Sequence, residues 1–327
     1  MRGPTMKILV TGCGGYIGTT LVPYLLRRGY GVKCVDWLAF GEDVLGHVNG
    51  EPGFQLIKAD VRDIDGSVFD GVDAVVDLAS ISNDPAGELD PELTLSINYR
   101  ARARNAKLAR ERGVSRYVLA SSCSVYGRQS GVADESTEPN PLTTYAKANL
   151  MAERDVLPLA GDSFTAVALR FATVYGPSRR MRFDLVVNAM TLSAMQEGRI
   201  YVEGDGMQQR PLVHVLDVAR AVAMMLEAPR DRVSGEAFNV GSDGQNYRII
   251  DVAKEVQAIT GSEVAFRGEV DKRSYAVSFR KIRSLGYDTL YAVGDGVRQV
   301  YHEVLLGYLR PEERWWTVKW YKRLLGK

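Results

Sequence analysis

The chain has 327 residues with 41 basic and 40 acidic side chains, and a formal charge of +1 gives no reason to expect a nucleic-acid partner. A hydrophobic fraction of 46% and a charged fraction of 25% indicate a folded protein and exclude a disordered one. No apolar run reaches the length of a membrane-spanning helix, and the first residues lack a signal-peptide core, so we expect no membrane partner.

Short β-branched runs alternate with helical patterns in the first half of the chain. Strands are predicted at 7–10, 32–35, 54–58, 74–78, 117–120 and 165–169. A helix is predicted from Gly18 to Arg28, and two glycines follow it as an end signal. The run at 74–78 is almost continuously apolar, as in a strand that is buried on both faces. This alternation predicts an α/β fold, a doubly wound parallel sheet with helices on both faces.

The pattern becomes less regular after Pro177. Helices are predicted at 183–196 and 249–259, strands at 199–202 and 238–240, and a long helix with an aromatic cluster within 294–327. Asp217 is expected to cap the helix that it begins. Because no linker separates the two patterns, we expect a smaller, sequence-interleaved substrate-binding lobe. The expected division is 6–176 plus 211–241 for the larger domain, and 177–210 plus 242–327 for the lobe.

The number and spacing of the cysteines indicate the redox state of the compartment in which the protein works. Cys13, Cys34 and Cys123 form neither a CxxC pair nor an even-numbered disulfide framework. The three histidines are equally scattered, so that no metal site is expected. We therefore expect a reduced, cytoplasmic protein.

The first predicted strand runs into a glycine-rich loop. Gly12, Gly15 and Gly18 have the spacing GxxGxxG, which allows a tight turn, close approach to a pyrophosphate and close helix–strand packing. Asp36 ends the second strand, where a carboxylate accepts hydrogen bonds from a ribose and repels a 2′-phosphate. This context predicts a Rossmann-type site for NAD rather than NADP. The alternative is a glycine-rich turn without a ligand.

Further motifs follow in the order of one known family. They are Asp60-Val61-Arg62-Asp63, Leu78-Ala79-Ser80, Asn98, the 121–127 segment SSCSVYG, Tyr145, the 170–177 segment RFATVYGP, the 210–215 segment RPLVHV and the 271–275 segment DKRSY. In these motifs the chain resembles the extended short-chain dehydrogenase/reductases, in the NAD-dependent epimerase/dehydratase branch that acts on nucleotide sugars. The resemblance covers nearly the whole chain.

The resemblance implies two sets of binding residues. The residues expected to hold NAD are Gly12, Gly15, Tyr16, Ile17, Gly18, Asp36, Asp60, Val61, Leu78, Ala79, Ser80, Asn98 and Tyr145. Those expected to bind a nucleotide sugar are Ser122, Cys123, Ser124, Thr173, Asn188, Arg210 and Arg273. Guanidinium groups suit a diphosphate because their planar fork makes two charge-assisted hydrogen bonds.

The catalytic motif departs from the family at one position. The resemblance implies that Tyr145 exchanges a proton with a sugar hydroxyl, which Ser122 orients, while the nicotinamide exchanges hydride with C4. Members of the family carry a lysine four residues after the tyrosine, and its ammonium stabilises the phenolate. Here that residue is Asn149, and Lys147 points nearly to the opposite side of a helix. We count Asn149 among the catalytic residues and expect a less acidic Tyr145 and slower proton transfer.

Asn149 leaves three interpretations open. The natural enzyme works without the lysine, the chain has lost or changed its catalysis, or the asparagine was introduced deliberately to trap a complex. The first interpretation is favoured, because a designed replacement would more often be alanine or methionine.

The predicted function is that of a nucleotide-sugar epimerase working through a transient 4-keto sugar. A keto-sugar reductase and a dehydratase of another type are the alternatives. Cys123 and Ser124 stand where related 4,6-dehydratases have an Asp-Glu pair, which argues against that mechanism. An NAD(H)-binding sensor or scaffold without turnover is an alternative of another class. A homodimer through the helices bearing Asn98 and Tyr145 is implied by the resemblance alone.

Overall fold

The computed structural model describes residues 6–269 and 273–327, in which the chain forms two compact units. The first unit consists of the chain up to Ser122, Thr143–Arg170 and Ala219–Phe238. The second consists of Cys123–Leu142, Phe171–Val218 and Asn239–Lys327. The division into 6–176 plus 211–241 and 177–210 plus 242–327 stays a prediction about which residues serve cofactor and substrate.

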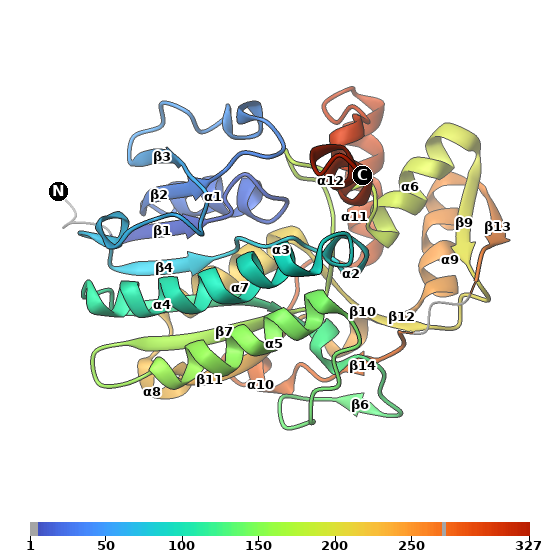
Figure 1. The fold of residues 1–327 in the computed structure, drawn as a ribbon. Helices are drawn as coiled ribbons and strands as arrows, with labels where there is room; N and C mark the ends of the chain where they lie inside the picture. The colour runs from blue at the N-terminus through green and yellow to red at the C-terminus, as the bar shows by residue number, and fades with distance from the viewer. Residues whose placement is uncertain (1–5, 270–272) are drawn as a thin grey trace. The chain divides into compact units, whose positions relative to one another are not determined.

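In the described part of the chain, the first unit is built on a seven-stranded sheet in the order β11-β7-β5-β4-β1-β2-β3 (Figure 1). Its strands are β1 (Lys7–Thr11), β2 (Gly31–Asp36), β3 (Phe54–Lys58), β4 (Ala74–Asp77), β5 (Arg116–Ser122), β7 (Thr165–Phe171) and β11 (Glu236–Val240). β1 pairs in parallel with both β2 and β4, so that Thr11 lies opposite Val35 and Asp77. The pairs β2–β3 and β4–β5 are parallel too. The predicted doubly wound parallel sheet is confirmed.

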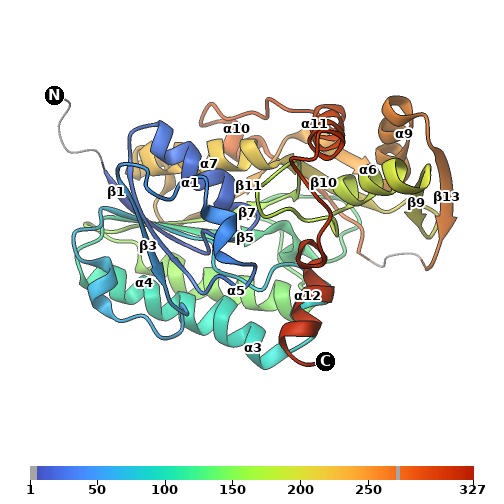
Figure 2. The same ribbon diagram turned by 90° about the horizontal axis from the view of Figure 1, so that it is seen from above.

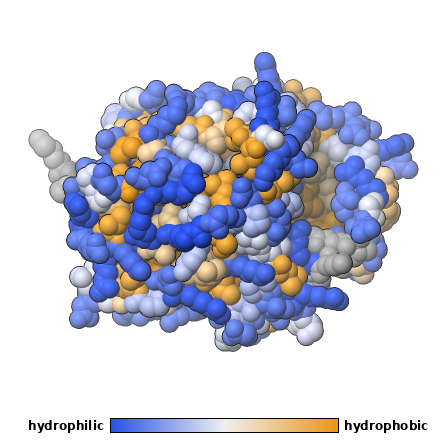
Figure 3. All heavy atoms as spheres, in the orientation of Figure 1, coloured by the Kyte–Doolittle hydropathy of each residue, from blue (hydrophilic) through white to orange (hydrophobic). Residues whose placement is uncertain are grey.

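Helices cover both faces of this sheet (Figures 1 and 2). α1 (Gly18–Arg27) and α7 (Val215–Glu227) lie on one face, and α4 (Arg102–Glu111) and α5 (Thr144–Val156) lie on the other. Because both faces are covered, every residue of β4 and β7 is buried. The remaining helices of this unit are short: α2 (Asp84–Gly87), α3 (Pro91–Leu95) and α8 (Arg230–Val233). Figure 3 shows mainly hydrophilic side chains over the face of this unit that α4 and α5 cover, with apolar ones scattered between them.

A wide helical turn joins α3 to α4. Residues Ser96–Ala101 form a π-helical turn, a geometry that is rare and often found beside functional sites. Asn98 in this turn and Arg102 at the start of α4 are both buried, at 0% and 1% exposure. The helix therefore directs two polar side chains inward at this point.

The second unit has smaller sheets and a helical core. Among the described residues, its sheets have the orders β12-β10-β8, β13-β9 and β14-β6. Their strands are β6 (Val132–Ala133), β8 (Thr173–Tyr175), β9 (Arg199–Glu203), β10 (Gln209–His214), β12 (Asn246–Arg248), β13 (Glu263–Arg267) and β14 (Ala276–Val277). Its helices are α6 (Val186–Glu197), α9 (Ile249–Thr260), α10 (Arg280–Arg283), α11 (Val293–Leu305) and α12 (Thr317–Leu324). α6, α9 and α11 pack together around Val187, Val252, Val256 and Val297.

Two local features of the second unit have simple causes. Gly198 and Gly261 end α6 and α9 in the left-handed conformation, at φ values of 67° and 71°. The helix predicted from residue 183 begins at Val186, because the backbone of Leu185 before it is extended, with φ −90° and ψ 139°. Within residues 6–269 and 273–327, no helix has the length and apolar character needed to span a bilayer.

Candidate active site

The glycine loop after β1 is shaped by close backbone contacts. Gly12 has a φ of +71°, and a Cβ there would lie 2.7 Å from the amide nitrogen of Ala79. A Cβ on Gly18 would lie 2.5 Å from the carbonyl oxygen of Gly12, and one on Gly15 would lie 3.1 Å from the same atom. No side chain caps the first turn of α1, which begins at Gly18. An uncapped helix N-terminus behind a loop without side chains suits a pyrophosphate, so these residues fit a dinucleotide.

Asp36 closes one side of this loop. Its two carboxylate oxygens accept hydrogen bonds from the N–H groups of Gly14, at 2.8 Å, and Leu38, at 2.7 Å. This ties the end of β2 to the loop and leaves lone pairs for ribose hydroxyls. In the same loop Tyr16 is buried and Ile17 is half-buried. Burial and the neighbouring Cys34 raise the pKa of the Cys13 thiol well above its ordinary value, so that no thiolate forms there at neutral pH.

The loop after β3 is held by its own arginine. Asp60 is half-buried and forms an ion pair with Arg62 at 2.7 Å. Burial raises the pKa of Asp60, but the hydrogen bonds from Arg62 outweigh it and keep that pKa below its ordinary value. The carbonyl of Val61 accepts hydrogen bonds from Arg104 and Asn105 on α4. Asp60 and Val61 are therefore held in one conformation before any adenine is bound.

The segment after β4 lies directly against the glycine loop. The N–H groups of Leu78 and Ala79 donate to the carbonyl and hydroxyl oxygens of Thr11, at 3.1 and 3.3 Å. Asn98 holds the following residue, Ile81, through both ends of its carboxamide, at 2.8 and 3.0 Å. Asn98 therefore holds the segment that contains Ser80. Both polar groups of the Asn98 side chain take part in these hydrogen bonds to Ile81.

Tyr145 lies in the first turn of α5. This helix begins where the hydroxyl of Thr143 accepts the N–H of Ala146, and the same hydroxyl donates to Asp84 at 2.5 Å. A Cβ on Gly87 would lie 3.0 Å from the Cβ of Tyr145, so that α2 fixes the root of the tyrosine. α5 packs on β5, which ends at Ser122. Because the carboxyl ends of parallel strands share one edge of a sheet, Ser122 lies at the same edge as the glycine loop.

A buried ion pair fixes the middle of α5. Glu153 binds Arg170 of β7 at 2.6 Å and also accepts the hydroxyl of Ser121. Both charged side chains are almost fully buried. This contact sets the rotation of α5 on the sheet, so that Asn149 is buried while Lys147 is exposed.

The side chain of Asn149 has a charged hydrogen-bond partner. Its carboxamide oxygen accepts a hydrogen bond from Nη1 of Arg102 at 3.0 Å. Arg102 was not predicted from the sequence, although it follows Asn98 by four residues and so shares the buried face of its helix. That spacing was the available signal.

The predicted sugar-binding residues lie in the second unit, except Ser122. Cys123 and Ser124 are buried in a 3₁₀ turn, Cys123–Tyr126. Thr173 opens β8, opposite Leu212 of β10. The carboxamide of Asn188 accepts the N–H of Gly176 and donates to the carbonyl of Arg182, both at 3.0 Å, and is fully buried. Asn188 thus holds two loop segments by their backbone.

The structure brings the two predicted phosphate-binding arginines together. Nη1 of Arg210 donates to the carbonyl oxygen of Arg273, and its guanidinium lies 5.3 Å from the ring centre of Tyr275. Asp271 and Lys272 of the same motif lie outside the described residues. The Arg210 side chain on strand β10 therefore holds the backbone of the segment that begins at Arg273.

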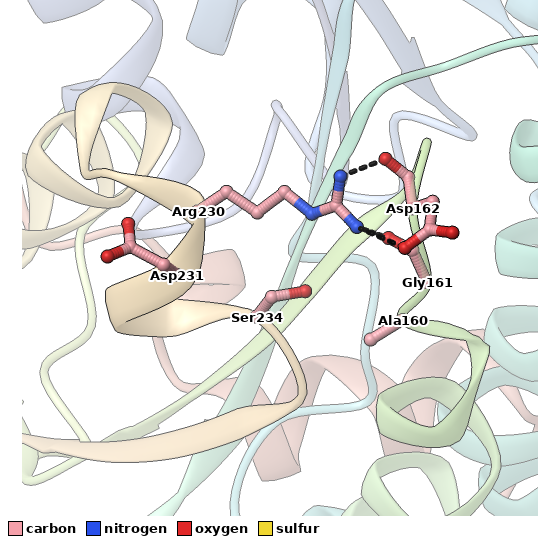
Figure 4. Close-up of a pocket in the computed structure, with 6 residues that line it drawn as sticks. All are labelled: Ala160, Gly161, Asp162, Arg230, Asp231 and Ser234. Carbon is pink, nitrogen blue, oxygen red and sulfur yellow. Dashed lines mark hydrogen bonds and ion pairs between the residues drawn. The ribbon is translucent and has the colours of Figure 1, made fainter.

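Two other features carry no catalytic motif. In the described ranges, no group of His, Cys, Asp and Glu side chains is arranged to hold a metal ion. A surface hollow in the first unit is lined by Ala160, Gly161, Asp162, Arg230, Asp231 and Ser234 (Figure 4). There Arg230 donates to the carbonyls of Gly161 and Asp162. These segments precede β7 and β11, whereas the glycine loop follows β1.

Comparison with known proteins agrees with this geometry. Residues 8–241 match the model of the NAD dependent epimerase/dehydratase family. The chain is 28% identical to an uncharacterized UDP-glucose epimerase of Bacillus subtilis, over 89% of this chain and 96% of that one. It is 29% identical to a dTDP-glucose 4,6-dehydratase of Streptomyces griseus, over 95% and 96% of the two chains. A solved UDP-glucuronic acid 4-epimerase from Bacillus cereus, in complex with UDP-glucuronic acid and NAD, superposes with a TM-score of 0.82 at 25% identity, over 93% and 100%.

Proposed function

The chain belongs to the NAD-dependent epimerase/dehydratase family, and from this we propose that it is a nucleotide-sugar epimerase that acts at C4 through a transient keto sugar. One observation carries the proposal. A single hydrogen-bonded network joins Thr11 before the glycine loop, Asp77 at the end of β4, Ala120 near the end of β5, and Asn149 on the Tyr145 helix, through Arg102. The elements that would hold the cofactor and the elements that would act on the sugar are thus parts of one assembly.

The cofactor site would be made by the glycine loop, Asp36 and the segments at 60–61 and 78–80. The uncapped start of α1 would face the pyrophosphate and the Asp36 carboxylate a ribose. NAD supplies the hydride acceptor and donor for C4 of the sugar. The solved Bacillus cereus relative holds NAD, which supports this assignment.

The chain's own residues would move the proton and hold the sugar. Tyr145 would take the proton of the 4-hydroxyl and return it after the keto sugar has turned its other face. Ser122 would orient that hydroxyl. Arg210 and Arg273 would bind the diphosphate, since a guanidinium forms two charge-assisted hydrogen bonds to such a group.

The family also contains dehydratases, and two residues speak against the 4,6-dehydratase reaction here. Elimination of water needs an acid and a base beside the sugar ring. Cys123 and Ser124, at the positions expected for that pair, bring no carboxylate. Besides the hydride exchange with NAD, a C4 epimerase needs a single acid–base side chain, and Tyr145 would supply it.

The test is to incubate the protein with NAD and a panel of nucleotide sugars that includes UDP-glucose and UDP-glucuronic acid. Products are followed by NMR in deuterated solvent. A 4-epimerase gives the C4 isomer without added NADH and without deuterium in the sugar ring. A product that forms only with NADH indicates a reductase, and loss of water with ring deuteration indicates a dehydratase. If NAD binds and every sugar stays unchanged, the protein is a binding protein and the proposal is wrong.

We also propose a homodimer in the cytoplasm. The thiols of Cys13, Cys34 and Cys123 form no disulfide, which supports a reducing compartment. The exposed side chain of Met151 on α5, 37% accessible, supports an interface on the Tyr145 helix. Sedimentation of wild-type protein and of Met151→Glu tests the dimer, since a buried carboxylate at the interface would shift the population to monomer.

A further inference from the structure

The helix that carries Tyr145 contains a buried carboxamide one turn later. The amide nitrogen of Asn149 donates to the carbonyl of Tyr145 at 3.1 Å, while its oxygen accepts Nη1 of Arg102 at 3.0 Å. Asn149 is 2% exposed and Arg102 is 1% exposed. A guanidinium offers only donors, so it fixes which end of the amide faces it. Arg102 therefore sets the orientation of the Asn149 side chain.

Arg102 is itself held by two strands of the sheet. Its Nε donates to the carboxylate of Asp77 at 3.3 Å, and its Nη2 donates to the carbonyls of Asp77 and Ala120. Asp77 also accepts the hydroxyls of Thr11 and Tyr117, both at 2.6 Å. The guanidinium thus has one buried counter-charge, and its remaining Nη1 faces residue 149.

We propose that Arg102 is a positioning residue and that Arg102 and Asn149 form a matched pair. Arg102 brings a buried positive charge to the Tyr145 helix from the neighbouring helix, and Asn149 is the neutral acceptor that this charge requires. In this pairing Asn149 has a defined role of its own, and its presence is not simply the loss of a lysine. The catalytic part of this inference rests on the proposed function, whereas the pairing itself does not.

The pairing has a direct electrostatic consequence. A lysine at 149 would place an ammonium against the Arg102 guanidinium in a region from which water is excluded. Two buried like charges repel strongly because the surroundings screen them poorly. A lysine at position 149 is therefore destabilising while Arg102 carries its charge, and much less so when that charge is removed.

The experiment is a double-mutant cycle on the full chain. Asn149→Lys, Arg102→Met and the double variant are compared with wild type, because methionine removes the charge while keeping most of the length of the side chain. Each is measured for Tm, for the Kd of NAD, and for kcat and KM with a nucleotide sugar. Arg100→Met, alone and with Asn149→Lys, is the matched control, since Arg100 lies in the preceding turn and pairs with the exposed Glu92.

Asn149→Lys alone is expected to lower Tm and to reduce kcat at least about tenfold while KM stays within about twofold. The double variant is expected to regain most of that loss in both Tm and kcat. The effects of Arg100→Met and Asn149→Lys on Tm and kcat are expected to be additive, as they are for independent sites. If Asn149→Lys is as stable and active as wild type, or if Arg102→Met has the same effect in both backgrounds, the pairing is wrong.

Asn149→Asp keeps the test valid if Arg102→Met does not fold. A carboxylate facing the guanidinium should leave Tm closer to wild type than a lysine does, and the reverse order would overturn the proposal. If no sugar is turned over, Tm and the Kd of NAD still measure the coupling between positions 102 and 149. A failed proposal of function is then distinguishable from a failed pairing.

Discussion

Each unit of the molecule has an arginine–aspartate pair whose arginine is buried, and the two pairs have different surroundings. In the first unit, Arg102 and Asp77 bind segments of β1, β4, β5 and α5, including the helix of Tyr145. In the second unit, Arg182 binds Asp184 at 2.8 Å. Thr317 joins this cluster by donating to Asp184 and accepting from Arg180, so that it fastens the chain near 315–317 to the loop before α6. A buried ion pair is therefore no sign of catalysis by itself, and what matters is which elements it holds.

The largest difference between the two pairs is expected when each loses its carboxylate. Asp77→Asn should cost about 3–5 kcal/mol of unfolding free energy, because it leaves the Arg102 guanidinium buried without a counter-charge. It should also reduce kcat, since the same guanidinium orients Asn149. Asp184→Asn should cost less, about 2 kcal/mol, because the side chains of Arg182 and Asp184 are 8% and 14% exposed, against 1% and 3% for Arg102 and Asp77, so water partly replaces the lost counter-charge.

The unfolding free energies of the two variants are measured by denaturant titration. Their kcat values are measured well below both Tm values, so that the protein is folded in the assay. An equal loss of kcat in the two variants would contradict a specific role of the Asp77–Arg102 pair in orienting Asn149.

The glycine loop should separate cofactor binding from sugar binding. Gly12→Ala would strain a backbone at φ +71° and place its Cβ 2.7 Å from Ala79, so NAD affinity should fall at least about tenfold. Gly50→Ala is the matched control, because Gly50 has a φ of +87° but a Cβ there would meet no atom within 4 Å. Isothermal titration with NAD checks both variants. An equal loss of NAD affinity in the two variants would show that backbone strain alone causes it, and not the close contact between Gly12 and Ala79.

In the second unit, a substitution is expected to weaken sugar binding without changing NAD binding. Arg210→Met should raise the KM of the nucleotide sugar about tenfold and leave the Kd of NAD unchanged, because one charge-assisted pair to a diphosphate is lost. Initial rates over a range of sugar concentrations give the KM. A changed NAD affinity with an unchanged KM would place Arg210 outside the sugar site.

The smallest effect concerns His214 in the second unit. Burial lowers the pKa of His214, and the hydrogen bond to Gln299 and the charges of Asp217 and Asp295 offset it only in part. The unfolded chain therefore takes up a proton near pH 6.5 that the folded chain does not, and stability falls as the pH decreases below that value. Tm measured between pH 7.5 and pH 5.5 should fall less in His214→Gln than in wild type. Parallel pH curves for the two proteins would contradict this.

The sequence predicted those parts of the fold and site that depend on local chemistry. Gly12 and Gly18 lie where the backbone leaves no room for a Cβ, and Gly15 lies where a Cβ would be tight; this follows from their spacing after a strand. The alternation of apolar runs was enough to predict the parallel sheet. Tyr145 was placed correctly on a helix by its motif.

Long-range polar contacts were not predicted. Asp217 was expected to cap its own helix; its carboxylate also accepts the N–H groups of Leu290 and Tyr291, 73 and 74 residues away, and no local pattern predicts those contacts. Arg102 was overlooked because a charged residue in a helix usually faces solvent. The counter-charge that allows its burial, Asp77, comes from a strand 25 residues earlier. Such partners become visible only when the strands and helices are assembled.

The proposed epimerisation depends most on Tyr145, which would move the proton of the sugar hydroxyl. The most direct measurement follows the C4 isomers of one nucleotide sugar by NMR, with the sugar chosen because it raises Tm in the presence of NAD. We predict that wild type interconverts the two isomers and that Tyr145→Phe does so at least about 100-fold more slowly, the range for loss of a general acid–base, while its affinity for sugar and NAD stays the same. Equal rates in the two proteins, or no conversion of any stabilising sugar by wild type, would contradict the account.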